Sequence, residues 1–361
     1  METGTSVQQH AATTVYQRQI SDPSAWSKSQ FDGDNSWIVN LTEGDIEELE
    51  NALCTARKIL ADRCGLTEQD FPLKSLAPKL KSCLEQVQYG RGFALLRGLP
   101  VGKLSNEDAE LIFRGIGTYL GEVVSQNAKG DLLGHVRDAG YADYRGRDDI
   151  RGYQTRANLE FHTDVVDIVG LMCLRPAMQG GESLIVSSTT VHNEILRLSA
   201  AHLGLLYGNF LFDRRGEEQV GQPPYFVSPI YSFYRGALSC RPAVIDYIFS
   251  AEKKTGISLS PAQKEALHLF VEQTLRPDLQ LSMELQAGDI QFINNSVILH
   301  SRTAFVDYEE PKKRRHLLRL WLNVADGRPV DPTAFPYRNG VPVGRSVSVA
   351  HNAAFEPGDH A

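Results

Sequence analysis

Apolar residues recur every three or four positions in several stretches of this chain, which is the spacing of an amphipathic helix. The clearest stretch is 45–62, where Ile46, Leu49, Leu53 and Ala56 fall on one stripe. Further helices are predicted at 74–87, 106–120, 190–201, 242–252 and 261–275. Asn106 is the predicted N-cap of the helix that begins there.

The rest of the chain has the shorter apolar runs that predict β-strands. The predicted strands are 91–99, 168–174, 183–186, 229–233, 281–285, 290–293 and 316–324. Short strands separated by glycine-rich turns are typical of a jelly-roll sandwich. We therefore predict an α+β protein with a mainly β core, a double-stranded β-helix (jelly roll) that carries an N-terminal helical layer.

The pattern contains no internal repeat and no clear linker, so we predict one such domain over residues 36–335. Residues 1–35 are rich in Ser, Thr, Gln and Asp and are expected to form a flexible N-terminal arm, and 336–361 a C-terminal tail. Residues 129–156 are rich in Gly, Asp, Arg and Tyr with weak periodicity. Because long irregular loops are usually functional or disordered, we expect this one to shape a substrate entrance.

The composition of the chain limits the kinds of molecule that we expect it to bind. The 361 residues are 42% hydrophobic and 22% charged, with a net charge of -7, which argues against nucleic acid or an anionic membrane. Five cysteines without CxxC spacing favour a reducing compartment. With no apolar signal core and no run of about 20 apolar residues, we expect a cytoplasmic protein with a small-molecule partner. Homo-oligomerisation is left open.

Two distant stretches supply candidate metal ligands. One is 158–164 (NLEFHTD), and the other is 288–300 (GDIQFINNSVILH). On an extended strand His162 and Asp164 leave the same face, and His300 adds a second imidazole from elsewhere in the fold. Two histidines and one carboxylate are the ligand set of non-haem Fe(II). The alternatives are a chance HxD tripeptide and a histidine that bonds to backbone.

A third stretch, 314–323 (RRHLLRLWLN), places two arginines on one strand face. Arg315, Leu317, Arg319 and Trp321 alternate there. Charges among apolar neighbours need a counter-charge, which is either a protein carboxylate or an anionic small molecule held bidentately. His135, in the loop before the first motif, is a further candidate for contact with substrate.

As a set, these motifs resemble the TauD/TfdA family of Fe(II)- and 2-oxoglutarate-dependent oxygenases over roughly residues 90–325. The resemblance rests on NxxxHTD at 158–164, GGES at 180–183, GD…H at 288–300 and the arginine strand. It implies that His162, Asp164 and His300 are iron ligands. It also implies that Arg315 and Ser183 bind the distal carboxylate of 2-oxoglutarate, that Arg319 grips an anionic group of the substrate, and that Asn158 lies near that substrate.

The activity that this resemblance implies is a dioxygenase that uses Fe(II), 2-oxoglutarate and O2 and releases succinate and CO2. Hydroxylation of a C–H bond is the default reaction, and desaturation, epoxidation or cyclisation would use the same site. The expected substrate is a small metabolite that bears a carboxylate or another anion, in specialised metabolism. The alternatives are a zinc-dependent hydrolase of the same fold and a non-catalytic protein that binds a metal or small molecule.

Overall fold

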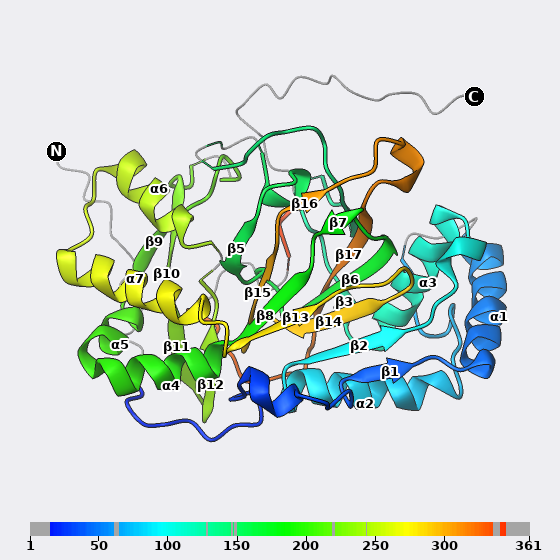
Figure 1. Ribbon diagram of the computed structural model, residues 1–361, viewed down its shortest axis with the longest axis horizontal. Coiled ribbons are helices and arrows are strands. Elements are labelled where there is room, and N and C mark those ends of the chain that lie inside the picture. Colours follow the sequence, from blue (N-terminus) through cyan, green and yellow to red (C-terminus); the bar gives the residue numbers. More distant parts are fainter. Residues whose placement is uncertain are drawn as a thin grey trace.

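Two β-sheets face each other at the centre of the computed structural model (Figure 1). The structure describes residues 15–60, 65–127, 129–145, 147, 150–218, 221–242, 244–334 and 340–343. Because apolar side chains from both inner faces pack together, among them Val169, Ile185, Ile293 and Leu317, the sheets enclose a common core. The predicted double-stranded β-helix with a mainly β core is confirmed.

The larger sheet has the strand order β1-β2-β14-β6-β17-β3, and β4 also pairs with β17. Its strands are β1 (Ile38–Asn40), β2 (Phe93–Arg97), β3 (Glu122–Val123), β4 (Leu133–Val136), β6 (Ile168–Arg175), β14 (Ile290–Asn294) and β17 (His316–Asn323). Strand β1 runs parallel to β2, whereas the other pairs are antiparallel. The continuous burial of β14 follows from its position between two neighbours with both faces covered.

The smaller sheet has the order β13-β8-β15-β5, with every pair antiparallel. Its strands are β5 (Leu159–His162), β8 (Ser183–Ser187), β13 (Gln280–Met283) and β15 (Ile298–Arg302). A short pair, β7 (Gln179–Gly180) with β16 (Phe305–Val306), lies beside it. His162 and His300 therefore lie on the same sheet.

An N-terminal helical layer covers the outer face of the larger sheet, as predicted (Figure 1). It consists of α1 (Glu43–Leu60), α2 (Leu76–Tyr89) and α3 (Asn106–Thr118). Leu49, Phe113, Phe292 and Leu318 are among the side chains that join the helices to the sheet. The N-cap of α3 is Ser105 and not Asn106, because the Ser105 hydroxyl accepts a hydrogen bond from the Asp108 N–H at 3.1 Å.

Between β8 and β13 the chain forms an insert, residues 188–279, on the side away from the helical layer (Figure 1). Its helices are α4 (Ser188–Leu198), α5 (Ala200–Leu206), α6 (Asp246–Thr255) and α7 (Pro261–Thr274). Its strands form two hairpins, β9 (Phe210–Asp213) with β10 (Tyr225–Ser228) and β11 (Tyr231–Tyr234) with β12 (Ala237–Cys240). An apolar cluster that contains Phe210, Tyr231 and Phe270 packs the insert against the smaller sheet, which contributes Phe161, Val186 and Leu299 to it.

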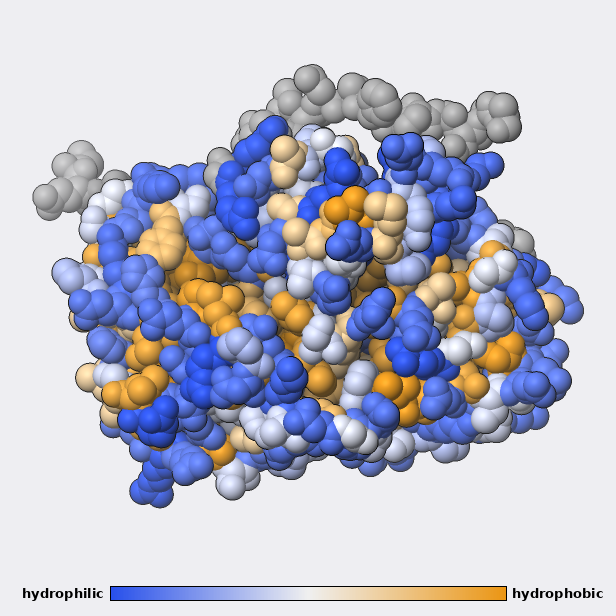
Figure 2. All heavy atoms as spheres, in the orientation of Figure 1, coloured by the Kyte–Doolittle hydropathy of each residue, from blue (hydrophilic) through white to orange (hydrophobic). Residues whose placement is uncertain are grey.

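Short 3-10 helices complete the regular structure, at Lys28–Phe31, Val101–Lys103, Gly152–Gln154 and Pro311–Lys313. Figure 2 shows hydrophobic and hydrophilic residues interspersed on one face of the molecule. Exposed large apolar residues such as Leu198, Ile257 and Leu275 lie apart in the sequence, which is ordinary for a globular surface. Among the described residues no helix is long and apolar enough to cross a membrane.

Two longer segments also differ from their predictions. The loop predicted at 129–156 contains β4 and a 3-10 helix, because β4 completes the edge of the larger sheet against β17. The described part of the predicted flexible arm, 15–35, packs on the domain: the Trp26 side chain is 2% exposed and its indole N–H donates to the Arg91 carbonyl at 2.8 Å. Residues 1–14 and most of 336–361 lie outside the described residues, so the domain boundaries stay predictions.

Candidate metal centre and its cavity

A cavity of about 510 Å³ lies at the inner faces of the two sheets and extends to the insert. Its size is that of a small-molecule site. The sheets contribute His162, Ser183, His300, Arg315 and Trp321, and the insert contributes Arg215, Phe226 and Tyr247. The cavity is therefore lined by the candidate metal ligands, by the segment 314–323 that carries Arg315 and Arg319, and by residues of the insert. The sequence did not connect the insert to the other two.

His162 and His300 stand directly opposite each other on β5 and β15. Their ring centroids are 4.3 Å apart, and one ligand atom from each of His162, Asp164 and His300 lies within 4.8 Å of the others. β5 ends at His162, and Asp164 follows two residues later with its carboxylate near both imidazoles. The three residues predicted as ligands are thus brought together.

The hydrogen bonds of the two imidazoles suit ligands of a metal. The His162 Nδ1 lies 2.8 Å from the Glu160 carbonyl, so Nδ1 carries the proton and Nε2 has a free lone pair. The buried Nδ1 of His300 has no hydrogen-bond partner among the described residues. Burial lowers the pKa of His162, and burial together with His162 lowers the pKa of His300 to about 3. Both rings are therefore neutral near pH 7, as a metal ligand must be.

Asp164 is held as a carboxylate by the groups around it. The Trp321 indole N–H donates to its Oδ2 at 2.8 Å, and the Asp164 N–H donates to the Asn295 side-chain oxygen at 3.0 Å. Burial alone would raise the pKa of Asp164, but the positive charge of Arg319 and the hydrogen bond from the Trp321 indole lower it. A buried carboxylate beside two neutral imidazoles fits Fe(II) in type and number of ligands.

Arg315 and Ser183 line another part of the cavity. The Arg315 side chain is buried, and its Nη1 has no hydrogen-bond partner among the described residues. Burial lowers the pKa of Arg315 to about 10. Since burying a charge without compensation is costly, this guanidinium is suited to an incoming anion. Asp307 is the near carboxylate, and its Oδ1 accepts from the Arg315 backbone N–H at 2.7 Å.

Two features of the GGES motif shape this anion site. Gly181 has a φ of +79°, and a Cβ placed there would lie 3.1 Å from the Arg315 Nε, so glycine makes room for the guanidinium. The Ser183 hydroxyl donates to the Gln291 side-chain oxygen at 3.0 Å. A rotation of the Gln291 amide would let its nitrogen donate to Ser183 instead, and the hydroxyl proton would then be available to a carboxylate.

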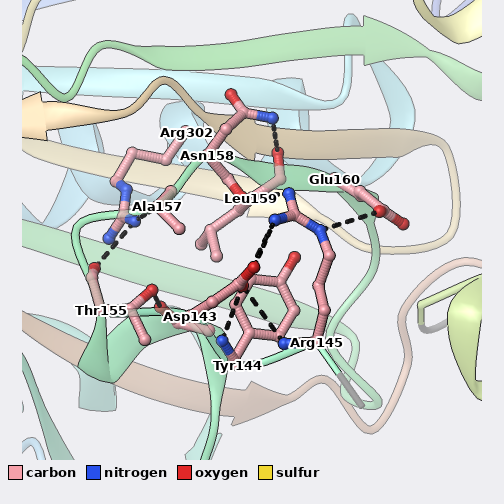
Figure 3. Close-up of polar contacts among 10 residues, drawn as sticks. Asp143, Tyr144, Arg145, Thr155, Ala157, Asn158, Leu159, Glu160 and Arg302 are labelled. Atoms are coloured by element: carbon pink, nitrogen blue, oxygen red, sulfur yellow. Dashed lines mark hydrogen bonds and ion pairs between the residues drawn. The ribbon is translucent and has the colours of Figure 1, made fainter. Parts of the chain in front are cut away.

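Arg302 is a lining residue that the sequence analysis missed. It lies two residues after His300 on β15, so both side chains leave the same face of the strand. Burial, followed by the charge of Arg315, lowers the pKa of Arg302 to about 9. Figure 3 shows its guanidinium directed at the loop that contains Thr155 and Ala157. The period-two spacing from His300 was the signal that could have found it.

Arg319 lies nearer to the candidate metal ligands. Its guanidinium carbon is 5.1 Å from the Tyr153 ring centroid and 4.9 Å from that of Trp321, and its Nη1 is 3.7 Å from the Asp164 Oδ2. Its Nε donates to the Gln126 side-chain oxygen at 2.8 Å. These contacts fix the guanidinium in one orientation at the cavity surface.

The remaining two predicted residues are placed differently. His135 borders the cavity, but its Nδ1 lies 2.9 Å from the His316 Nε2 and its Nε2 lies 3.8 Å from the Glu110 carboxylate on α3. Asn158 is exposed and is not among the lining residues; its amide donates to the Leu159 carbonyl at 3.2 Å (Figure 3). Their substrate contacts stay predictions, and in this structure both side chains are engaged elsewhere.

The charges of the described lining residues favour an anionic ligand. The arginines are Arg151, Arg214, Arg215, Arg302, Arg315 and Arg319, and the carboxylates are Asp131, Glu160, Asp164, Asp213 and Glu217. Asp164 would be committed to a metal ion, and Asp213 pairs with Lys254 at 2.8 Å. With a divalent metal bound, the balance would shift further towards positive charge.

Comparisons with known proteins agree on one family. The family described as "Taurine catabolism dioxygenase TauD, TfdA family" matches residues 57–321. FR-33289 synthase of Streptomyces rubellomurinus is 34% identical over 91% of this chain and 97% of its own length. Taurine hydroxylase-like protein SAT17 of Stachybotrys chartarum is 31% identical over 83% of this chain and 79% of its own length.

Solved structures share the fold at low sequence identity. An asparagine oxygenase in complex with Fe(II), 2S,3S-3-hydroxyasparagine and succinate has a TM-score of 0.61 and 18% identity, over 80% of this chain and 93% of the other. The non-heme iron oxygenase OrfP in complex with Fe and alpha-ketoglutaric acid has a TM-score of 0.55 and 14% identity, over 79% of this chain and 93% of the other.

Proposed function

This chain belongs to the taurine catabolism dioxygenase TauD/TfdA family, and on that premise we propose that it oxidises a C–H bond of a small, anion-bearing metabolite. The reaction class is that of the family: the protein is an Fe(II)- and 2-oxoglutarate-dependent oxygenase. The observation that carries the proposal is the placement of a histidine, aspartate and histidine site and a buried arginine in one cavity.

We assign iron binding to His162, Asp164 and His300. The neutral imidazoles and the ionised carboxylate match the ligand set, and the Glu160 carbonyl and the Trp321 indole orient two of them. When bound there, iron with 2-oxoglutarate supplies the oxidation of a substrate C–H bond by O2, with release of succinate and CO2. Hydroxylation is the expected outcome, because it needs no further group from the protein.

We assign the distal carboxylate of 2-oxoglutarate to Arg315 and Ser183. The buried guanidinium offers an unsatisfied Nη1, and a bidentate contact with a carboxylate would offset the cost of its burial. The serine hydroxyl is the second donor. Together they would fix the direction in which the 2-oxo acid end points towards the iron ligands.

We assign the anionic group of the prime substrate to Arg319. The guanidinium sits beside Asp164, so a substrate held by it is close to the metal centre. Tyr153 and Trp321 cover its faces, and the apolar Leu171 and Leu317 also line the cavity, so substrate binding would displace water from the site. The insert residues Arg215, Phe226 and Tyr247 also line the cavity and would select the rest of the substrate.

A cytoplasmic setting is part of the proposal. Of the described cysteines, Cys83, Cys173 and Cys240 are buried free thiols and Cys54 is an exposed one, which supports a reducing compartment. The net charge of -7 supports a small-molecule partner in preference to nucleic acid. The two alternatives from the sequence have less support, because a zinc hydrolase does not need the buried arginine and a non-catalytic protein does not need an intact ligand set.

The test is an anaerobic titration with Fe(II) and 2-oxoglutarate. The wild-type protein should give a weak visible charge-transfer band, and His162→Ala should abolish it. Arg315→Gln should keep the band but require more 2-oxoglutarate for half-saturation. A screen of carboxylates, sulfonates and amino acids for succinate release would then identify the substrate class. Absence of both the band and succinate release in the wild-type protein would refute the proposal.

Substrate recognition is tested separately with Arg319→Gln. This variant should raise the KM of the prime substrate and leave the 2-oxoglutarate concentration for half-saturation within a few-fold of the wild-type value. Arg315→Gln is its matched control, since it should do the reverse. If the KM of the substrate does not change in Arg319→Gln, the assignment of Arg319 is wrong.

A further inference from the structure

We propose that Arg302 is a second cationic anchor for the distal carboxylate of 2-oxoglutarate, and that it links occupation of that site to the loop forming one wall of the substrate cavity. The inference rests on the proposed function. Arg302 stands opposite Ser183 in the register of β15 and β8, and both residues line the cavity. The candidate anchors Arg315 and Ser183 thus have a third donor beside them.

The hydrogen-bond donors of the Arg302 guanidinium form two sets, one bonded to the loop and one without a partner among the described residues. Its side chain is 5% exposed. Its Nη2 donates to the carbonyl oxygens of Thr155, at 2.9 Å, and Ala157 (Figure 3). Its Nε and Nη1 are buried and have no hydrogen-bond partner among the described residues. One edge of the guanidinium therefore holds the loop, and the other donors are left for a ligand.

Arg302 and Arg315 share one aromatic neighbour. Their guanidinium carbons lie 4.8 Å and 5.1 Å from the ring centroid of Phe305. No ion pair joins either guanidinium to a carboxylate in the part of the chain that the structure describes. Two like charges buried close together repel each other and need compensation. A carboxylate bound by both guanidinium groups would offset that repulsion and satisfy the free donors, which is the arrangement expected of an anion site.

The loop that Arg302 holds forms part of the cavity wall. Gly152 and Tyr153 line the cavity, and Tyr153 covers the guanidinium of Arg319. The stretch 150–158 is attached to the sheet at few points, among them the Phe305 N–H to the Arg156 carbonyl at 3.2 Å. If a bound carboxylate holds the Arg302 guanidinium in place, the hydrogen bonds from that guanidinium to the Thr155 and Ala157 carbonyls should be formed for more of the time. Cosubstrate binding would then order the wall of the substrate chamber, and by linkage an ordered wall would strengthen cosubstrate binding.

The experiment combines a binding titration with hydrogen–deuterium exchange. The Fe(II)-loaded protein is titrated anaerobically with 2-oxoglutarate in the absence of prime substrate, and amide exchange in 150–158 is followed with and without 2-oxoglutarate. In the wild-type protein 2-oxoglutarate should slow exchange in this stretch. In Arg302→Gln the dissociation constant for 2-oxoglutarate should rise roughly 10- to 100-fold, and the slowing should be lost even at saturation.

Two further variants separate the proposal from a merely structural role. Arg302→Lys keeps the charge and should recover part of the affinity without restoring the full protection of the loop. Arg145→Gln removes another tether of the same segment, since the Arg145 Nη2 donates to the Asn158 carbonyl at 3.4 Å, and Arg145 also pairs with Asp143 and Glu160 (Figure 3). It should speed exchange with and without 2-oxoglutarate and change the affinity by less than about 3-fold.

The outcomes are distinct. If Arg302→Gln and Arg302→Lys both bind 2-oxoglutarate with wild-type affinity while Arg315→Gln binds it weakly, the inference about Arg302 fails and the proposed function stands. If the wild-type protein forms no complex with 2-oxoglutarate, the proposed function fails as well. If affinity falls but exchange in 150–158 never responds to 2-oxoglutarate, Arg302 is an anchor and the link to the loop is wrong.

Discussion

The hydrogen bond from Trp321 to Asp164 offers a sharp test of the metal centre. The substitution Trp321→Phe keeps an aromatic ring in the cavity wall and removes the indole N–H that donates to the Asp164 Oδ2 at 2.8 Å. Both side chains are buried, at 7% and 8% exposure, so water replaces the lost donor poorly. We expect the carboxylate to lose its fixed orientation and the protein to bind Fe(II) more weakly.

The magnitude follows from the charge and the burial. A hydrogen bond to a charged group contributes about 1.5–3 kcal/mol, which corresponds to roughly 10- to 150-fold in a binding constant. Groups that orient metal ligands typically cost about 10- to 100-fold in metal affinity when removed. The Arg319 charge, 3.7 Å from the same carboxylate oxygen, remains in the variant and keeps Asp164 ionised. A loss of about 10- to 100-fold in Fe(II) affinity is therefore expected, without loss of the fold.

The assay is an anaerobic competition titration with a chelator of known Fe(II) affinity, with circular dichroism to check the fold. The matched control is Trp37→Phe, which removes an indole N–H that donates to the Asp34 carbonyl at 3.0 Å, away from the cavity. The control should bind Fe(II) as the wild type does. Equal Fe(II) affinities for Trp321→Phe and wild type would refute the reasoning that this contact orients the ligand.

Three further predictions concern other parts of the molecule. Gly181→Ala should weaken 2-oxoglutarate binding several-fold, because the added Cβ would approach Arg315, and a binding titration would measure this. The same variant should destabilise the protein by about 1–3 kcal/mol in a thermal melt, because φ at this position is +79°. Asp167→Asn should lower the free energy of unfolding by about 3 kcal/mol, because it removes the carboxylate that pairs with the buried Arg241 at 2.7 Å; an unchanged midpoint of denaturant unfolding would contradict this. Burial lowers the pKa of His192 to about 4, so the unfolded chain binds more protons than the folded one between about pH 6.5 and 4. Unfolding free energy should therefore fall by up to about 3 kcal/mol as the pH drops through that window, and His192→Gln should flatten the fall.

For a physical reason, the sequence identified the residues that the structure brings together as a candidate metal centre more readily than the residues of the cavity wall. His162, Asp164 and Arg315 belong to short motifs in which residues two positions apart share one face of an extended strand. This relation depends only on local sequence, so it can be recognised without knowledge of the rest of the fold. The pairing of His162 with His300 across β5 and β15 depends on long-range register, which a single sequence does not specify. The resemblance to a family supplied that information in this case.

The predicted substrate contacts were harder to place from the sequence, because they depend on where the loops and the edge strands of the larger sheet lie. His135 was placed in an irregular loop, but it lies on β4, opposite Leu318 of β17, and its imidazole turns to His316 and the helical layer. Alternation along β4 puts the neighbouring Gly134 opposite Arg319, where a Cβ would lie 2.7 Å from the Gln126 side-chain oxygen. The direction of these side chains is set by the pairing of β4 with the edge of the larger sheet. The weak periodicity of residues 129–156 gave no indication of this strand.

The insert of residues 188–279 has a consequence for how this enzyme could be altered. Its apolar cluster differs from the core between the sheets, but it includes Phe161, Val186 and Leu299 of the smaller sheet. Arg215, Phe226 and Tyr247 from the insert line the cavity. Because these three side chains come from the insert and not from the segments that carry the candidate iron ligands, substitutions there would change the cavity wall without replacing a residue of those segments. Directed evolution for new substrates would thus begin at the insert, where recognition can be rebuilt while the oxidising centre is left untouched.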